Sequence, residues 1–517
     1  MKKAKKILQI AAFSFVALFA ALAVKAAKPN IIFILADDLG YGDVGYNWDS
    51  CEGKIKTPNI NKLAMSGVRL SAHYAAAPVS APSRASLLTG RIQGECSLKD
   101  NCFDRPFAEK DTLGSILKKA GYTTWAVGKW GIAGGGESGQ SVTAHPLDKG
   151  FDYYYGFLDH MAGHTYYHYR GNVRGAFMGI TENRSDATDT AIGRYSTDLF
   201  MAKTKDLISK HTIDASGKPF FLYLAVNAIH GSGFCDDSLK CKKPLHVPGG
   251  PFPEEGVAWP LKAEPHALRN TWINPAYAHL PENQARYATA ITRLDDSIGD
   301  LVRHLEKLGI ARDTVIIFTS DNGPADEYGA DPRAFTSNGP FDGLKRDVFE
   351  GGLRVPTFVN WPNGITSGQI DIAPSQFHDW MATLAEIGGV SQKEKEECKF
   401  GGVSLLPRWT KGSASALPSR IYSAYNFPWQ GSTEAFKDFK ARKGEVRGQQ
   451  QMVREGDFVA LRTRIGSSSS KVRLYNVVKD PYQKEDLSAK PQYTEKLKRL
   501  TEILSKKNGD SPLFLQP

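Results

Sequence analysis

The sequence predicts an α/β fold: a large mixed, mostly parallel sheet flanked by helices, followed by a smaller C-terminal α+β subdomain. Continuous apolar runs at 31–36, 219–226 and 314–319 are typical of parallel strands that are buried on both faces. Segments with helical periodicity, such as 112–120 and 284–308, lie between them. A chain of 517 residues also exceeds one typical hydrophobic core, which favours two domains.

The N-terminal segment indicates export. Four of the first six residues are lysines, an apolar stretch follows from 7 to 24, and Val24-Lys25-Ala26 resembles a small-residue cleavage site. A membrane anchor is the alternative, because an apolar run of about 18 residues is at the short limit for a span. We therefore expect a signal peptide at 1–26, no stable membrane span, and a periplasmic or secreted protein.

The rest of the chain divides into two unequal parts. Composition becomes strongly charged near 393–397, and beyond it lie strand-like pieces at 458–461 and 472–475 and a helical segment near 493–506. We expect a main domain at 27–415. The C-terminal subdomain at 416–517 would carry a small antiparallel sheet and a terminal helix.

Charge narrows the choice of partners. The formal net charge is +10, and it falls to +5 without residues 1–26, which carry five lysines and no acid. This mild excess suits an anionic substrate, whereas no basic run with interleaved aromatics predicts nucleic-acid binding.

The six cysteines leave disulfide pairing open. Export permits disulfides, and Cys96 with Cys102, or Cys235 with Cys241, could close small loops. No Cys-x-x-Cys occurs, so the sequence does not suggest a structural zinc site.

Acidic pairs and amides follow two of the predicted strands. Asp37 and Asp38 follow the run 31–36, and Asp321 and Asn322 follow 314–319. Ligands bind at the carboxyl ends of strands in open α/β sheets, and adjacent carboxylates repel unless a cation joins them. Hard oxygen ligands suit Ca²⁺ or Mg²⁺, whereas solvated turns are the plain alternative.

The stretch from Ser80 to Arg91 predicts a short helix with Ser80 just ahead of its N-terminus. Pro82 fits the first turn and Gly90 is a natural stop. Free N–H groups and the positive end of the helix dipole make such a terminus an anion site, to which Arg84 can add a cationic fork. A capped surface helix is the plain alternative.

This dodecamer resembles the sulfatase motif C/S-x-P-S-R-x-x-x-L-T-G-R at every fixed position. Further blocks resemble the same family in order along the chain: 29–38, 128–131, 227–230, 320–323 and 343–356. The chain is similar to type I sulfatases of the alkaline-phosphatase-like superfamily over nearly the whole mature length. The resemblance makes 27–415 the catalytic domain.

The resemblance also implies the composition of the active site. Ser80 would be converted to formylglycine (3-oxoalanine) by a serine-type radical maturase before export, since a plain serine hydroxyl without a base is a weak nucleophile. One calcium ion would be held by oxygen atoms of Asp37, Asp38, Ser80, Asp321 and Asn322.

The same resemblance assigns four further catalytic residues. Arg84, Lys129 and Lys345 would neutralise sulfate oxygens, and His230 would lie near the leaving oxygen as a general acid. We also expect His164 and Arg170, in an aromatic- and His-rich stretch, to contact a sugar.

One departure from the family pattern concerns Gly131, which stands where relatives have His in G-K-W-H. In relatives that His is thought to help abstract a proton from the formylglycine hydrate. His145, His160 and His164 are nearby in sequence and are the candidates to replace it.

Together these features predict an exported sulfatase that hydrolyses sulfate monoesters of a carbohydrate. By analogy only, we favour as substrate a galactose or N-acetylgalactosamine sulfate in glycosaminoglycan, mucin or algal glycans. Two alternatives stay open: a phosphodiesterase or phosphonate hydrolase of the same superfamily, and a non-catalytic relative that binds sulfated glycans.

Overall fold

The computed structural model describes residues 28–47, 54–101, 107–134, 143–215, 217–234, 245–327, 330–398, 400–410, 419, 421–425, 448–465 and 470–509. The signal peptide predicted at 1–26 lies outside these residues.

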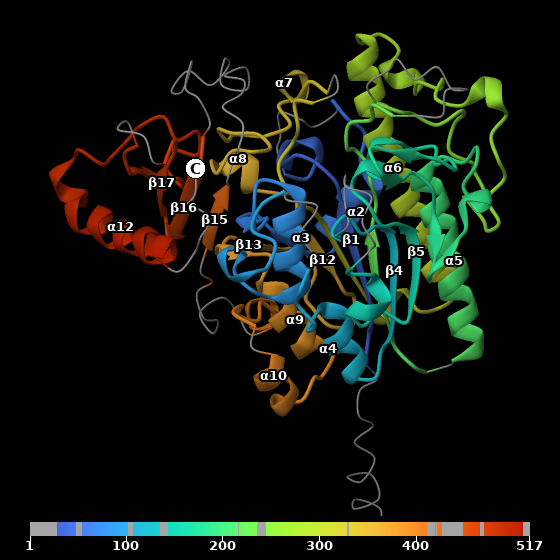
Figure 1. Cartoon of the computed structure of the whole chain (residues 1–517), viewed down its shortest axis with the longest axis horizontal. Helices are drawn as coiled ribbons and strands as arrows, with labels where there is room; N and C mark the ends of the chain where they lie inside the picture. Colours follow the sequence, from blue (N-terminus) through green and yellow to red (C-terminus); the bar gives the residue numbers. More distant parts are fainter. Residues whose placement is uncertain are drawn as a thin grey trace, which may run out of the picture.

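A ten-stranded mixed sheet forms the centre of the molecule (Figure 1). Its strands are β1 (Asn30–Ala36), β2 (Val68–Leu70), β4 (Thr123–Lys129), β5 (Tyr153–Phe157), β8 (Thr181–Glu182), β9 (Ser185–Asp186), β10 (Phe220–Ala225), β11 (Thr314–Ser320), β12 (Phe358–Asn360) and β13 (Gln369–Asp371). They lie in the order β13-β2-β12-β11-β1-β10-β4-β5-β8-β9. The five central strands, from β11 to β5, are parallel, and antiparallel strands flank them on both sides.

Helices cover both faces of this sheet. On one face lie α2 (Pro58–Met65), α5 (Ser196–Asp214) and α6 (Glu282–Lys307), and on the other lie α3 (Ser80–Thr89), α4 (Leu113–Lys119) and α9 (Asp379–Ile387). Because side chains alternate along a strand, Ile32 and Ile34 of β1 pack into the first layer, and Ile31 and Phe33 pack into the second. Burial on both faces explains why these strands are continuous apolar runs.

Shorter elements complete the main domain: β3 (His73–Tyr74), β6 (Asn172–Val173), β7 (Ala176–Phe177), β14 (Ser375–Gln376), α7 (Pro332–Phe335), α8 (Glu350–Leu353), α10 (Gln392–Cys398) and α11 (Leu406–Thr410). The predicted large, mostly parallel sheet flanked by helices is confirmed.

A separate antiparallel sheet lies at the C-terminal end, as predicted. It consists of β15 (Ile421–Tyr425), β16 (Gln450–Glu455), β17 (Phe458–Arg462) and β18 (Arg473–Asn476), followed by α12 (Thr494–Gly509). Leu500 and Leu504 of α12 pack on one face of the sheet, and Phe349 and Val79 of the main domain lie in the cluster on its other face. The predicted boundary near 415 falls outside the described residues and stays a prediction.

The cysteines require one correction. Cys96 is a buried free thiol beside Thr89 Oγ1, so it does not close a loop with Cys102. Cys398 is also free and buried. The other four cysteines lie outside the described residues. Within the described part of the chain, no helix combines the length and apolar character needed to cross a membrane.

Candidate active site

The ends of the central parallel strands meet at one place. Asp37 and Asp38 follow β1, and Asp321 and Asn322 follow β11, its neighbour in the sheet. The Asp321 N–H donates to Ala36 O at 3.1 Å, and the Asp38 N–H donates to Asp321 Oδ1, also at 3.1 Å. Asp38 adopts a left-handed backbone with φ of 64°, which turns the chain sharply at the strand end. The two acidic segments are therefore held together, as their position at adjacent strand ends predicts.

Helix α3 brings Ser80 to these carboxylates. Val79, with an extended backbone, takes the cap position, so Ser80 is the first helical residue rather than the residue ahead of it. Gly90 ends the helix with φ of 64°, as expected. Ser80 Oγ donates to Asp321 Oδ2 at 2.5 Å and lies 3.3 Å from Asp37 Oδ1.

Three buried carboxylates are matched by three buried cations. Lys129 Nζ lies 2.5 Å from Asp37 Oδ2, and Lys345 Nζ lies 2.9 Å from Asp38 Oδ2. Arg84 Nη2 lies 2.8 Å from Asp321 Oδ2. Burial raises the pKa of Asp321, and the nearby Asp37 charge raises it further. The cluster therefore concentrates charge of both signs where water is excluded, and a buried charge there is costly unless it is paired.

The residues present fit a divalent cation. Asn322 Oδ1 is buried and has no hydrogen-bond partner among the described residues. Ligand atoms of Asp37, Asp38 and His230 all lie within 4.8 Å of one another. Carboxylate and amide oxygens are the ligands that calcium prefers, and an orphaned amide oxygen beside three carboxylates is what such a site requires.

Arg84 does not lie where the sequence placed it. Its side chain is fully buried behind Ser80 and does not line the pocket described below. Both Nε and Nη2 donate to Asp321 Oδ2, and Nη2 lies 3.6 Å from Asp37 Oδ1. In this structure Arg84 positions carboxylates, and its contact with a sulfate stays a prediction.

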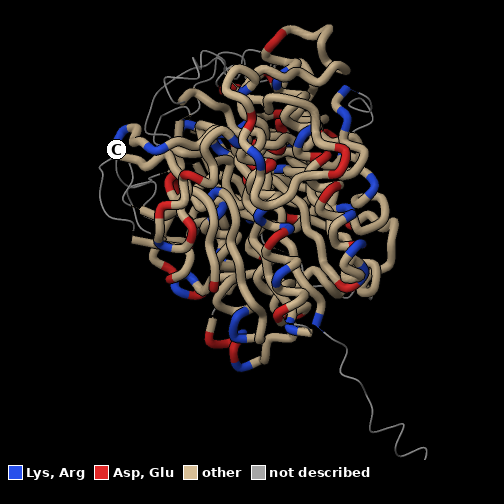
Figure 2. The backbone as a smooth tube through the Cα atoms, turned by 90° about the vertical axis from the view of Figure 1, so that its right-hand side faces the viewer, with Lys and Arg blue, Asp and Glu red and all other residues tan. Residues whose placement is uncertain are grey.

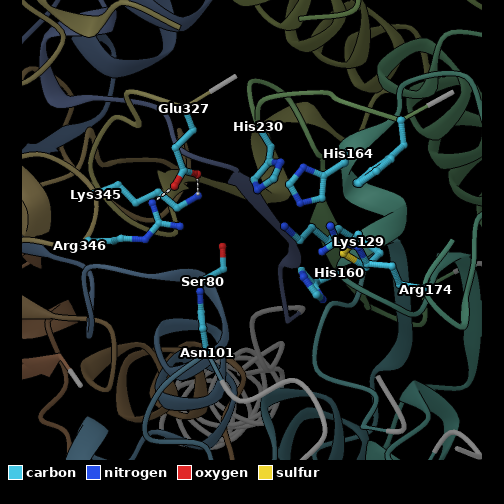
Figure 3. Close-up of a pocket in the computed structure, with 12 residues that line it drawn as sticks. Ser80, Asn101, Lys129, His160, His164, Arg174, His230, Glu327, Lys345 and Arg346 are labelled. Carbon is cyan, nitrogen blue, oxygen red and sulfur yellow. Dashed lines mark hydrogen bonds and ion pairs between the residues drawn. The ribbon is translucent and has the colours of Figure 1, made fainter. Parts of the chain in front are cut away.

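A cavity of about 210 Å³ opens above Ser80 (Figure 3). Four predicted residues line it together with Ser80: Lys129, His164, His230 and Lys345. The figure shows the Ser80 side chain pointing into the cavity. Lys345 lies on one side, and Lys129 lies on the other with the two histidines. The structure thus brings together the predicted nucleophile, both predicted sulfate lysines and the predicted general acid.

Both predicted histidines are buried, and burial disfavours their protonated form. Burial lowers the pKa of His230 well below its usual range, and the charge of Lys129 lowers it further. Burial also lowers the pKa of His164 to about 3. His230 Nδ1 lies 3.0 Å from Gly231 O, so it carries the hydrogen and leaves Nε2 free to accept a proton. Nε2 lies 3.9 Å from Asp38 Oδ2.

Arg170 lies away from the cavity. Arg170 pairs with Asp186 at 3.0 Å and with Asp189 at 3.3 Å on an exposed surface, and it does not line the cavity. Its guanidinium is held by acids that the sequence alone could not pair with it. Arg170 thus lies apart from the cavity residues, and its contact with substrate stays a prediction.

Of the candidates to replace the family histidine at Gly131, His145 is excluded. Its Nε2 hydrogen bonds with Asn183 O at 2.7 Å, and it lies outside the cavity. His160 and His164 both line the cavity. Gly131 itself has φ of 72°, and a Cβ there would lie 3.2 Å from Lys129 Cε. The missing side chain therefore leaves room for Lys129.

Sequence reasoning missed several lining residues: Asn101, Met161, Arg174, Phe234, Glu327 and Arg346. Glu327 lies 3.2 Å from Lys345 Nζ and also pairs with Arg346. Arg346 directly follows a predicted site lysine, which was an available signal. Arg174 is followed by Gly175, a pattern that indicates a tight turn but gives no direction.

Comparison with known proteins identifies the family. The profile of the family described as Sulfatase matches residues 29–390. The chain belongs to the sulfatase family. It is therefore a sulfuric ester hydrolase with the alkaline-phosphatase-like fold, and the predicted family is confirmed.

Named relatives agree with this assignment. The sulfatase is 30% identical over 444 residues to N-acetylgalactosamine-6-sulfatase of Mus musculus, covering 79% of this chain and 74% of the relative. It is also 30% identical over 419 residues to steryl-sulfatase of Homo sapiens, covering 74% and 70% of the two chains.

Solved structures share the fold over nearly the whole chain. Ps i-CgsB, solved in complex with k-i-k-neocarrahexaose, superposes with a TM-score of 0.70 and 26% identity, covering 94% of this sulfatase and 93% of that chain. The phosphonate monoester hydrolase of Agrobacterium radiobacter superposes with a TM-score of 0.58 and 17% identity, covering 93% and 95%. At that identity the similarity shows the fold alone.

Proposed function

We propose that this sulfatase is exported and hydrolyses the sulfate ester of a carbohydrate, with formylglycine at position 80 and one calcium ion. The observation that carries the proposal is the position of Ser80 Oγ, which lies between Asp37 and Asp321 at the base of a cavity flanked by Lys129 and Lys345. A tetrahedral anion fits such a place because fixed cations stabilise the charge that it carries through the reaction.

The chain's own residues have distinct tasks. Lys129 and Lys345 neutralise sulfate oxygens from opposite sides of the cavity, and Asp37 and Asp38 hold their ammonium groups in place. His230 presents Nε2 to the cavity; to act as the general acid, this nitrogen would first take up a proton and then donate it to the leaving oxygen. Arg84 fixes Asp321, which in turn holds the hydroxyl of Ser80.

The site also suits the two groups that the family uses. A hydrated formylglycine at position 80 would supply an oxygen nucleophile, and a calcium ion held by the carboxylates would reduce their mutual repulsion and supply Lewis acidity. Support comes from the buried Asn322 Oδ1, which has no hydrogen-bond partner among the described residues. Asp37, Asp38, Asp321, Asn322 and residue 80 would hold the ion.

The carbohydrate part of the proposal rests on relatives. An N-acetylgalactosamine-6-sulfatase is 30% identical to this chain, and a carrageenan-oligosaccharide complex is among the similar structures at 26% identity. Both involve galactose-type sugars, which favours a galactose or N-acetylgalactosamine sulfate. Lys and Arg positions are intermixed with Asp and Glu positions along the backbone drawn in Figure 2, which does not favour a nucleic acid as partner.

The remaining part of the proposal concerns export of the chain and conversion of Ser80. The lysine-rich start and apolar stretch at 7–24 are the basis for a periplasmic or secreted location. A serine-type radical maturase would act on Ser80 before export, because the folded chain leaves Ser80 only 7% exposed.

The deciding experiment is mass spectrometry of the tryptic peptide Leu70–Arg84 from protein made in its native host. A peptide lighter by two hydrogen atoms at Ser80 supports the proposal. Fully unmodified Ser80 contradicts it and favours a phosphoester hydrolase or a non-catalytic glycan binder. Parallel assays with an aryl sulfate and an aryl phosphodiester separate the first of these from a sulfatase, and binding of a sulfated sugar without turnover identifies the second.

A further inference from the structure

A two-residue turn carries an unusual residue into the active-site cavity. Strands β6 and β7 pair antiparallel, with Val173 opposite Ala176, so Arg174 and Gly175 alone form the connection. Both have a left-handed backbone, with φ of 49° for Arg174 and 83° for Gly175. This is the pattern of a type I′ turn, whose first position is usually Asn, Asp or Gly. A long β-carbon-bearing side chain there is disfavoured, so its presence calls for a reason.

The position of Arg174 at the active-site cavity offers such a reason. Arg174 lines it, and Figure 3 places Arg174 on the side of Lys129 and His160, across Ser80 from Arg346. Arg346 likewise has a left-handed backbone, with φ of 75°. Both arginines that line this cavity therefore hold a conformation that their side chains do not favour.

Arg174 differs from the other cations of the cavity in its charge balance. Lys129 pairs with Asp37, Lys345 pairs with Asp38 and Glu327, and Arg346 pairs with Glu327. Arg174 makes no ion pair with any residue that the structure describes, and its side chain is exposed at the cavity. Arg174 is therefore the cation of this cavity whose charge is not neutralised by a described carboxylate and is available to bind a ligand.

A neighbouring hairpin shows the ordinary arrangement. Strands β8 and β9 are also joined by two residues, and there Asn183 takes the left-handed position with φ of 54°. Arg184, which follows it, pairs with Asp148 at 2.6 Å and lies outside the cavity. At this turn, away from the cavity, Asn takes the left-handed position, although Arg464 and Gln483, both with φ of 51°, hold it elsewhere in the described chain.

We propose that Arg174 is a specificity residue that binds a second anionic group on the substrate, besides the sulfate that is cleaved. The group would be a carboxylate or a second sulfate, since a guanidinium binds either through two parallel N–H···O bonds. The inference rests on the proposed sulfatase function, because Ser80 and the two lysines fix where the first sulfate lies. The substrate class is therefore a doubly anionic carbohydrate.

A matched set of substrates and variants tests this. The substrates are a monosulfated N-acetylgalactosamine, a disulfated N-acetylgalactosamine and a sulfated disaccharide that contains a uronic acid. The variants are Arg174→Asn, which suits the turn, Arg174→Lys, which keeps the charge, and Arg184→Gln as control, each checked for thermal stability. The readout is the ratio of kcat/KM for a doubly anionic substrate to that for the monosulfate.

We expect Arg174→Asn to lower this ratio by about 10- to 100-fold, mainly through KM, since a charge-assisted pair is lost. Arg174→Lys should retain part of the ratio, and Arg184→Gln should retain all of it. Preference for the disulfate or for the uronate identifies which anion is bound. An unchanged ratio in Arg174→Asn, or no preference in the unaltered protein, overturns the inference.

Failure of the proposed function would look different. Matured protein that turns over none of the three compounds contradicts sulfatase action on these sugars. Calorimetric titration of wild type and Arg174→Asn with the same three compounds then decides the inference alone. Loss of affinity confined to the doubly anionic compounds supports Arg174 as their binding group, and equal affinity in both proteins overturns it.

Discussion

His164 and His230 share one backbone carbonyl. Nδ1 of His164 lies 3.1 Å from Gly231 O, and Nδ1 of His230 lies 3.0 Å from the same atom. The two rings meet edge-on with centroids 4.4 Å apart. Each Nδ1 therefore carries its hydrogen, and the two imidazoles are fixed in the same tautomer with Nε2 as the reactive atom.

This shared carbonyl predicts that the two histidines act as a coupled pair. We expect His230→Ala to lower kcat about 10²- to 10⁴-fold, the usual contribution of a proton-transfer group, and His164→Ala to have a smaller effect. The fold-decrease in kcat of the double variant should be smaller than the product of the two single fold-decreases. The difference corresponds to a coupling energy of about 0.5–3 kcal/mol. His145→Gln, outside the cavity, is the control. Strictly multiplicative effects would show that the two rings act independently.

The carboxylate cluster predicts that calcium stabilises the fold. Chelation should lower both activity and the melting temperature, and adding calcium at about 100 times its Kd should restore about 2.7 kcal/mol of stability. Asp321→Asn should weaken this response, measured by differential scanning fluorimetry across a calcium titration. Asp148→Asn, at the surface, should respond like the unaltered protein. A melting temperature indifferent to chelator in the unaltered protein would rule out a resident ion.

Gly131 predicts a local effect on Lys129. In Gly131→Ala the new Cβ would lie 3.2 Å from Lys129 Cε, so the lysine must shift. Gly217→Ala shares the left-handed backbone, with φ of 83°, but its Cβ meets nothing within 4 Å. Both changes should cost about 1 kcal/mol of unfolding free energy. Only Gly131→Ala should also lower kcat/KM, by at least tenfold; equal activity in the two variants would contradict the contact.

Buried neutral histidines away from the site predict acid sensitivity. His73 accepts a hydrogen bond from Trp380 Nε1 at its Nε2, and burial lowers its pKa to about 3. Burial also lowers the pKa of His246 to about 3. In the unfolded chain these two histidines bind a proton near pH 6.5, whereas in the folded chain they do so only near pH 3. The stabilisation is therefore complete above pH 6.5 and decreases as the pH falls from 6.5 toward about 3.

The measurement is the free energy of unfolding at pH 7.5, 6.5 and 5.5. Each such histidine should contribute a slope of up to about 1.4 kcal/mol per pH unit below its unfolded pKa. His73→Gln keeps a hydrogen-bond acceptor for Trp380, and it should remove the contribution of His73 to the slope of unfolding free energy against pH. A free energy of unfolding that is level from pH 7.5 to 5.5 would show that these rings accept protons in the folded state.

The sequence predicted what depends on short-range pattern. Apolar runs identified β1, β10 and β11 because burial on both faces leaves that mark, and strand-end position placed Asp37 and Asp321 together. Gly90 marked the end of α3 for the same local reason.

It could not predict which partner a long cationic side chain takes. Arg84 turns to Asp321, and Arg170 turns to Asp186, through contacts across 237 and 16 residues. Arg174 and Glu327 enter the cavity only because distant segments fold over it. Such contacts leave no periodic trace in the sequence, so only the assembled fold reveals them.

The position of β1 in the sheet has a consequence for how the chain is made. Its first residue, Asn30, hydrogen bonds with Phe220 and Thr314, which follow it by 190 and 284 residues. This central strand is thus the first to be translated, and its two neighbours, β10 and β11, follow much later in the chain. A nascent chain that ends before Thr314 leaves one edge of this apolar strand without its partner. We therefore expect early intermediates of synthesis to expose an apolar edge that can pair with another molecule.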